Sequence, residues 1–170
     1  MDFLDLAKQR CSVRSFIDEE VPDEVISRII EAGMVAPTAC NNQPIRIVVL
    51  KSEEALEKLK LCTKYHFQAR IAFIICYKED ECWKRSYDQK SSGDIDASIV
   101  ASHMMLEAQD EGIGSTWVMS FDPDIVKKEY ELEEGLEPVC ILPMGYPSKD
   151  YEPSSKHFEK KTPDQILIVK

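Results

Sequence analysis

Apolar residues return every three or four positions in five segments of the chain, which predicts five helices. Two of the predicted helices carry clear start signals: Asp94 is placed to cap one, and Asp122 followed by Pro123 opens another. Gly112 ends the helix that Asp94 begins. The predicted helices cover residues 2–9, about 22 to before Pro37, 53–61, 94–111 and 122–130.

Short apolar runs rich in β-branched residues predict strands between these helices. They cover residues 45–51, 69–77, 115–119 and 139–142, and the run at 69–77 is apolar enough to be buried on both faces of a sheet. Residues 79–92 are polar and predict a short helix or a loop exposed on one side. The apolar end at residues 167–169 needs a surface to pack on, either its own sheet or a neighbouring subunit.

Length and charge narrow the class of protein. The chain has 170 residues and 44% hydrophobic content, which fits one domain over residues 1–170. A net charge of −10, with no long basic run, argues against a nucleic-acid partner. The amino terminus lacks the apolar run of a signal peptide, and the longest apolar run, 71–76, is too short to span a bilayer. We expect a soluble, cytoplasmic protein with no membrane partner.

The six cysteines and three histidines do not predict a metal site. No Cys-x-x-Cys occurs, and in a chain without a secretory signal reduced thiols are favoured over disulfides. His103 and Glu107 share a helical face, yet this spacing alone favours a satisfied polar pair over metal ligands.

Arg10, Ser12 and Arg14 alternate along a segment that we expect to be extended, so their side chains project to one side. Two guanidinium groups and a hydroxyl on one face make a binding site for an anion. The alternative is a plain surface cluster, in which Arg10 caps the first helix and Arg14 pairs with Asp18 or Glu19.

A second group of polar residues lies at Asn41-Asn42-Gln43-Pro44, just before a predicted strand. Amide side chains both donate and accept hydrogen bonds, which suits the edge of a heterocycle that carries carbonyl and N–H groups. Asn and Pro are also common turn residues, so an ordinary turn is the alternative.

Five motifs in order make the chain resemble the nitroreductase family over nearly its whole length. Residues 10–16 match Arg-x-Ser-x-Arg-x-Phe, residues 36–44 match Ala-Pro-Ser/Thr-x-x-Asn-x-Gln-Pro, and residues 112–117 match Gly-Leu/Ile-Gly-x-x-Trp after the long helix. Residues 145–147 match Gly-Tyr-Pro, and residues 160–163 match a basic tail that ends in proline. Each motif is weak alone, but the ordered set is specific.

This resemblance implies an α+β nitroreductase-like fold: a central, mostly antiparallel sheet flanked by helices, in an intertwined homodimer with FMN at the subunit interface. The tail, from about 148 to 170, would pack on the partner. The resemblance assigns FMN to Arg10, Cys11, Ser12, Arg14, Pro37, Thr38, Asn41, Gln43, Trp117, Val118, Met119 and Lys161.

The resemblance also suggests roles for these residues. Arg10, Ser12 and Lys161 would hold the phosphate, and Arg14 would stabilise negative charge near N1 and the C2 carbonyl of the reduced flavin. Asn41 and Gln43 would hold the ribityl chain and the pyrimidine edge, and the backbone N–H groups of Val118 and Met119 would approach N5 and O4.

Three features depart from the family pattern. Met119-Ser120 stands where many relatives have a glycine pair, and Cys11 stands where others often have a basic residue, which places a thiol near the phosphate site. The region that covers the flavin in larger members is compressed into residues 82–92. Trp83, Tyr87 and Lys90 could therefore shape the substrate pocket, or belong to a surface loop.

The expected activity is a ping-pong oxidoreduction in which NADH or NADPH passes hydride to flavin N5, and a nitroaromatic, quinone or similar small molecule accepts it. No side chain is needed as an acid or base, so no catalytic residue is predicted. Alternatives are a flavin protein reduced by a protein donor or storing FMN, a non-catalytic dimeric binding module, and a thiol enzyme without flavin. The thiol enzyme would use Cys40 or Cys11 with His103 or His157.

Overall fold

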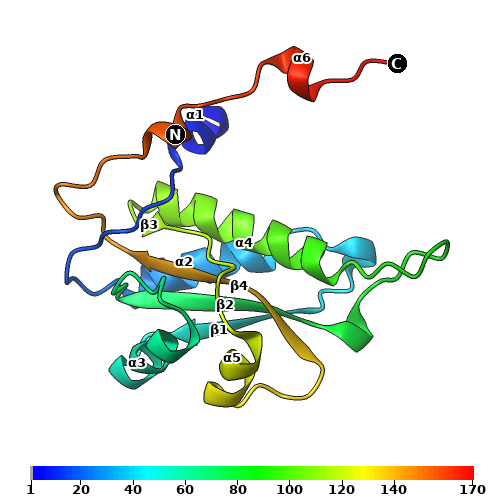
Figure 1. The fold of residues 1–170 in the computed structure, drawn as a ribbon, viewed down its shortest axis with the longest axis horizontal. Coiled ribbons are helices and arrows are strands. Elements are labelled where there is room, and N and C mark those ends of the chain that lie inside the picture. The colour runs from blue at the N-terminus through cyan, green and yellow to red at the C-terminus, as the bar shows by residue number, and fades with distance from the viewer. Residues whose placement is uncertain (1) are drawn as a thin grey trace.

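A four-stranded antiparallel sheet forms the centre of the computed structural model, which describes residues 2–170 (Figure 1). The strands lie in the order β1-β2-β4-β3. β2 is buried along residues 71–76, as its apolar run predicts, because both faces of the sheet are covered. The strands are β1 (Ile45–Leu50), β2 (Ile71–Lys78), β3 (Gly114–Ser115) and β4 (Leu136–Gly145).

Helices cover both faces of this sheet, α2 and α4 on one and α3 and α5 on the other (Figure 1). This arrangement confirms the predicted α+β class, with a central antiparallel sheet flanked by helices. The α-helices are α1 (Phe3–Gln9), α2 (Asp23–Met34), α3 (Glu53–Cys62), α4 (Gly93–Asp110), α5 (Pro123–Glu129) and α6 (Pro163–Ile166). Three single-turn 3-10 helices are η1 (Ala39–Asn41), η2 (Glu79–Glu81) and η3 (Ser155–His157).

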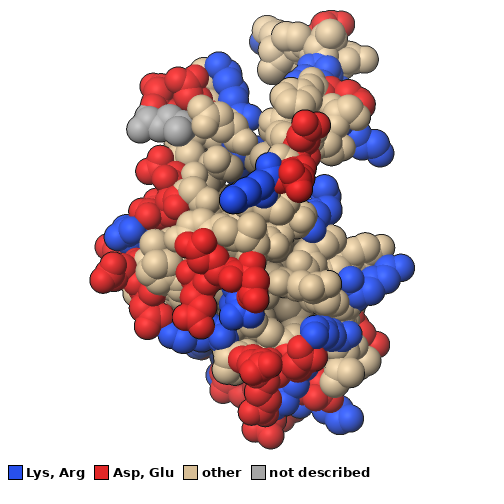
Figure 2. Space-filling model, turned by 90° about the vertical axis from the view of Figure 1, so that its left-hand side faces the viewer, with Lys and Arg blue, Asp and Glu red and all other residues tan. Residues whose placement is uncertain are grey.

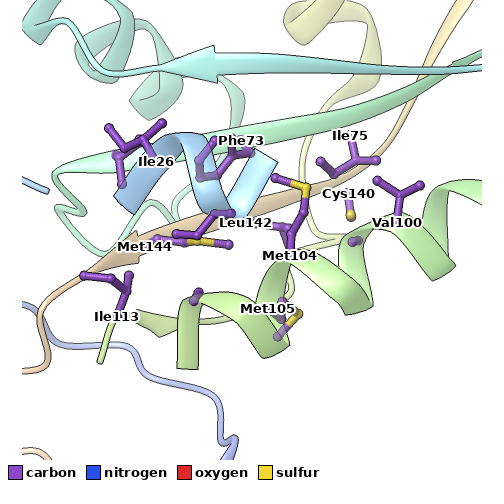
Figure 3. Close-up of a cluster of buried hydrophobic side chains, with 14 of the residues drawn as sticks. Ile26, Phe73, Ile75, Val100, Met104, Met105, Ile113, Cys140, Leu142 and Met144 are labelled. Carbon is purple, nitrogen blue, oxygen red and sulfur yellow. The ribbon is translucent and has the colours of Figure 1, made fainter. Parts of the chain in front are cut away.

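The larger hydrophobic core lies between the sheet and the α2–α4 layer. Val100 and Met104 of α4 point toward side chains of β2 and β4, and Ile26 of α2 closes the cluster (Figure 3). Fully burying an aliphatic side chain stabilises the fold by about 1.5–3 kcal/mol. Because α4 contributes several buried side chains to this core, its packing fixes the positions of the segments that precede and follow it.

Two predicted elements differ from the structure. The strand expected at 115–119 is reduced to β3 and one isolated bridge between Val118 and Ile141. Thr116 N donates to Pro143 O in the same register, but Pro143 has no N–H to donate back, which interrupts the ladder. Asp94 is not the cap of α4: the helix begins at Gly93 with Ser92 in the N-cap position. Asp94 lies in the first turn, where its charge still favours the positive end of the helix.

The carboxyl-terminal segment rises past α1 and ends away from the body of the molecule (Figures 1 and 2). Ile168 is 82% exposed and Val169 is 91% exposed, so residues 2–170 provide no cover for the apolar end. Among residues 2–170, no helix combines the length and the apolar character needed to cross a membrane.

Candidate functional site

The segment that carries Arg10, Ser12 and Arg14 is extended and lies beside the chain after α4. Ser12 forms a parallel bridge with Ser115, and the Val13 N–H donates to Ser115 O at 2.9 Å. Val13 is buried, whereas Ser12 is half-buried and Arg14 is exposed. The predicted alternation is therefore present, with apolar side chains facing the core and polar ones facing outward.

Two glycine-containing motifs support this segment. Ile17 N donates to Tyr146 O at 3.0 Å, which joins the segment to the Gly-Tyr-Pro motif at the end of β4. Gly114 lies under Val13 so closely that an added Cβ would stand 2.7 Å from the Val13 Cβ. The second glycine of the Gly-x-Gly motif therefore provides the space in which the arginine-bearing segment lies.

Tyr151, which the sequence did not single out, fastens the tail to the same segment. Its hydroxyl lies 3.2 Å from Cys11 Sγ and donates to Ser12 O at 3.1 Å. Burial, followed by the hydrogen bond with Cys11, raises the pKa of Tyr151 to about 12, so the hydroxyl keeps its proton at neutral pH. A tyrosine in a polar stretch gives no sequence signal for such a contact.

The charges of the anion site have no counter-charge nearby. Within residues 2–170, no Asp or Glu oxygen lies within 4.0 Å of the Arg10 or Arg14 guanidinium, and Asp18 pairs with Arg70 instead. Arg10 does terminate α1, but through its backbone N–H to Leu6 O at 2.9 Å. Both guanidinium groups therefore remain available to an external anion.

The loop at residues 37–43, which we call the amide loop, has a strained backbone. Cys40, Asn41 and Gln43 have φ values of 52°, 56° and 52°, in the left-handed region that costs most residues free energy. Thr38 holds this shape, because its carbonyl accepts from Asn41 N and its hydroxyl accepts from Gln43 N, both at 3.0 Å. Pro37 is exposed at the start of the loop.

The amide loop differs from an ordinary turn in the number of strained residues that it contains. Strain in three non-glycine residues within four positions is maintained only where the surroundings enforce it, and it concentrates at binding sites. The side chains of Asn41 and Gln43 are exposed, so their amide groups can reach a ligand.

One chain does not bring the amide loop and the arginine-bearing segment together. Ala39 of the loop bonds to Asp96 in the first turn of α4, whereas Ser12 pairs with Ser115 beyond the other end of α4 (Figure 1). α4 has 18 residues and is therefore about 27 Å long. The two halves of the predicted site lie at opposite ends of this helix.

In the backbone just after Trp117, the N–H groups of Met119 and Ser120 form no hydrogen bond within residues 2–170. Val118 N donates to Ile141 O at 2.9 Å and is therefore committed to the sheet, contrary to the role expected for it. No such bond involves Met119 N in the described chain, and the Met119 side chain is 69% exposed. Trp117 itself packs against the core. Lys161 is exposed in the tail, beyond the point where His157 Nε2 lies 3.1 Å from Lys8 O.

Residues 82–92 form a short hairpin that projects from one end of the molecule (Figure 1). Lys84 and Ser91 form an antiparallel bridge that closes it. Tyr87, at its tip, is 96% exposed, and Trp83, at its base, is 39% exposed. Lys90 is exposed as well. The base of the hairpin lies near the amide loop, because Ser92 Oγ and Ala39 N both donate to the Asp96 carboxylate.

A cleft of about 920 Å³ lies elsewhere, between α2, α3 and the start of β2, and none of the predicted site residues lines it. Across residues 2–170, no group of three or more His, Cys, Asp or Glu side chains is arranged to hold a metal ion.

A family model described as the nitroreductase family matches residues 7–65 and 60–146 of the chain. The chain belongs to the nitroreductase family. A nitroreductase family protein from Clostridium difficile 630 is 38% identical, with 99% of this chain and 98% of that one covered and a TM-score of 0.92.

Two more distant nitroreductase relatives carry informative names. A Methanothermobacter thermautotrophicus protein, provisionally named NADH dehydrogenase/NAD(P)H nitroreductase, is 28% identical over 94% of this chain and 88% of its own. A Desulfovibrio desulfuricans structure, provisionally named a nitroreductase and solved in complex with FMN, has a TM-score of 0.80. It is 22% identical, with 100% of this chain and 97% of that one covered, and shows the shared fold.

Proposed function

We propose that this nitroreductase family member is a cytoplasmic, FMN-dependent oxidoreductase that takes electrons from NADH or NADPH. The names of relatives support the proposal: one is provisionally called an NAD(P)H nitroreductase, and a protein of the same fold was solved in complex with FMN. When bound, FMN would accept hydride at N5 and pass it to a nitroaromatic, quinone or similar acceptor in a ping-pong cycle.

The observation that carries this proposal is the pair of uncompensated guanidinium groups. Arg10 and Arg14 stand with Ser12 on the outward side of a segment that is fixed by backbone bonds to Ser115. A phosphate would receive charge-assisted hydrogen bonds from Arg10 and Ser12. We assign Arg14 to the pyrimidine side of the flavin, where it would stabilise negative charge, and Lys161 to the phosphate.

The amide loop supplies a second set of donors and acceptors. Asn41 and Gln43 would bind the ribityl chain and the pyrimidine edge, because their exposed amides can both donate and accept. The strained backbone holds these groups in place before the ligand arrives, which lowers the entropy cost of binding. The free N–H of Met119 would face the flavin ring.

A second copy of the chain would complete the site. The anion site and the amide loop lie at opposite ends of α4, too far apart to hold one FMN within a single chain. Two chains packed antiparallel along α4 would bring the anion site of each beside the amide loop of the other. We therefore propose a homodimer with FMN at the interface, in which the tail at about 148–170 packs on the partner.

The same packing gives the projecting hairpin a role. Tyr87 has almost no contact with its own chain, and Trp83 and Lys90 share the hairpin with it. We propose that these three residues line the substrate pocket over the flavin of the dimer. The protein would then act by binding, orientation and exclusion of water, with no side chain as acid or base.

A visible absorbance spectrum of the purified protein, with identification of the cofactor released by heat, tests this function. We expect a yellow protein that releases about one FMN per chain, and rapid bleaching in a stopped-flow instrument when NADH or NADPH is added. Bleaching by neither nucleotide would favour a flavin store or a flavoprotein reduced by a protein donor. A colourless protein that takes up no FMN would contradict the proposal.

The structure gives little support to a thiol enzyme. Cys11 is 8% exposed and contacts the Tyr151 hydroxyl, and no hydrogen bond joins a cysteine to His103 or His157 in residues 2–170. Cys40, the other candidate nucleophile, is exposed but forms no hydrogen bond to a general base within the described residues. Loss of activity on alkylation in a colourless protein is the result that would revive this alternative.

A further inference from the structure

Asp96 is a buried carboxylate that the proposed function has not yet used. Its residue is 2% exposed and lies in the first turn of α4, where the helix dipole favours a negative charge. Within residues 2–170, no Lys, Arg or His nitrogen lies within 4.0 Å of it. A buried charge without a cationic partner is costly unless hydrogen bonds satisfy it.

Two hydrogen bonds satisfy this carboxylate, and one of them comes from the amide loop. Ser92 Oγ donates to Oδ2 at 2.7 Å, and Ala39 N donates to Oδ1 at 2.9 Å. The bond to Ser92 stays within the start of α4, so it fixes the carboxylate. Because the carboxylate is fixed, its bond from Ala39 N holds the amide loop in place.

Ala39 immediately precedes the strained part of the loop. The next residue, Cys40, has a φ of 52°, and Asn41 has a φ of 56°. Two hydrogen bonds tie residues 37–43 to the rest of the described chain: the bond to Asp96, and the bond from Asn42 Nδ2 to Glu81 O at 3.1 Å. The bond to Asp96 is charge-assisted and shielded from water, which makes it the stronger of the two.

We propose that Asp96 is a positioning residue that holds the amide loop in its flavin-binding shape by accepting the Ala39 N–H. This inference rests on the proposed function only for the ligand, because the ordering of the loop is a property of the free protein. The essential feature is the acceptor oxygen. Asp96→Asn keeps an oxygen toward Ala39 and presents its amide to Ser92, whose hydroxyl can accept, whereas Asp96→Ala removes the acceptor.

Two readouts on full-length variants test this inference. The first is hydrogen exchange of the Ala39 amide in the protein without flavin, and the second is FMN affinity by fluorescence titration. Loss of one charge-assisted hydrogen bond predicts about tenfold faster exchange and about tenfold weaker FMN binding for Asp96→Ala. For Asp96→Asn we expect both quantities to stay within about threefold of the unmodified protein.

Asp122→Ala is the matched control, because Asp122 also accepts two hydrogen bonds at a helix start, from Asp124 N and Ile125 N, on the other face of the sheet. It should lower the melting temperature yet leave Ala39 exchange and FMN affinity unchanged. Ser92→Ala is the second variant if Asp96→Ala does not fold. This variant removes the hydrogen bond from Ser92 to the carboxylate. It should increase Ala39 exchange by less than Asp96→Ala does.

Several outcomes separate the two proposals. Unchanged Ala39 exchange in Asp96→Ala, or in Ser92→Ala where Asp96→Ala is unfolded, overturns the positioning role. If Asp96→Asn changes Ala39 exchange and FMN affinity as much as Asp96→Ala does, the positioning role is also overturned. The negative charge of Asp96 would then be the essential feature, and the acceptor oxygen would not. If the unmodified protein binds no FMN, the proposed function fails, while faster Ala39 exchange in Asp96→Ala still supports the anchoring of the loop.

Discussion

Arg10 and Arg14 lie on one extended segment, and within residues 2–170 neither has a carboxylate partner, in a protein whose formal net charge is −10. Acidic side chains are plentiful on the surface that Figure 2 shows, so the lack of a partner for these two arginines does not reflect a shortage of carboxylates. Positive charges that lack a counter-charge in the protein favour the binding of an anionic ligand. At the scale of single residues, this uncompensated charge is the strongest sign of a ligand.

Arg10→Ala should weaken FMN binding about 10-fold to 100-fold, because a hydrogen bond to a charged group contributes about 1.5–3 kcal/mol. The dissociation constant can be measured by quenching of flavin fluorescence. Arg70→Ala is the matched control. The Arg70 side chain is also exposed, but it pairs with Asp18 at 3.0 Å, so its removal should not affect FMN binding. Equal FMN affinity in Arg10→Ala and the unmodified protein would contradict the assignment of the phosphate site.

Sequence patterns predicted some site residues and missed others for a physical reason. Arg10, Ser12 and Arg14 were visible because side chains on an extended segment alternate, which needs only local geometry. Tyr151 and Asp96 were missed because their contacts join distant parts of the chain: Tyr151 bonds to Ser12 O, and Asp96 bonds to Ala39 N. No local spacing encodes such pairs.

At the scale of elements, helices were easier to predict than the strand after α4. α5 begins where Asp122 and Pro123 predict it, and Asp122 accepts from Asp124 N at 3.0 Å. The strand expected at 115–119 keeps one register with β4, but its ladder breaks after β3 because the residue opposite Thr116 is Pro143, which has no N–H to donate. Capping is a local property, whereas strand pairing depends on the whole fold.

Gly114→Ala should disturb the anion site through packing alone. The added methyl group would stand 2.7 Å from Val13 Cβ, so the arginine-bearing segment must move. Overpacking of this kind costs about 1–3 kcal/mol of folding free energy, and we expect FMN affinity to fall with it.

The double variant Gly114→Ala with Val13→Gly is the control for this packing effect. Removal of the Val13 Cβ and its two methyl groups makes room for the new methyl group, so the double variant should bind FMN better than Gly114→Ala alone. Urea unfolding and FMN titration on the three variants measure the coupling. A double variant that is worse in both assays than either single variant would contradict the close-packing explanation.

At the scale of the whole molecule, the tail ends in apolar side chains for which residues 2–170 provide no cover. Replacement of Leu167, Ile168 and Val169 with serine keeps the length of the tail but removes its apolar surface. Each buried aliphatic side chain contributes about 1.5–3 kcal/mol, so we expect the dimer to dissociate at least about 100-fold more readily. Sedimentation equilibrium measures this change.

Glu152→Ser with Lys156→Ser controls for this tail variant, because both are exposed polar residues of the same segment. The control should dimerise as the unmodified protein does. An unaltered dimer in the serine variant of the apolar end would show that the tail does not pack on the partner.

The buried thiols make stability sensitive to alkaline pH. Burial raises the pKa of Cys62 to about 11 and that of Cys76 to about 12, from an ordinary value of 9.0. Between pH 9 and 11 the unfolded chain therefore loses protons that the folded protein keeps. The free energy of unfolding is unaffected by these thiols below pH 9 and should fall above it, by up to about 1.4 kcal/mol per pH unit for each thiol.

Urea unfolding at pH 8, 9 and 10 in the presence of a reductant measures this fall. Cys76→Ala removes one of the two thiols and should make the decline with pH shallower, whatever its effect on stability at pH 8. A free energy of unfolding that stays constant from pH 8 to 10 would show that these thiols titrate in the folded protein as they do in the unfolded chain.

Sedimentation equilibrium recorded at the visible absorbance of the flavin tests the central claim most directly, because it reports FMN binding and the assembly state together. The account predicts that the absorbing species has twice the mass of the chain and carries about one FMN per chain, since each site takes residues from both copies. FMN bound to a single chain, or a dimer that takes up no FMN, would contradict the account.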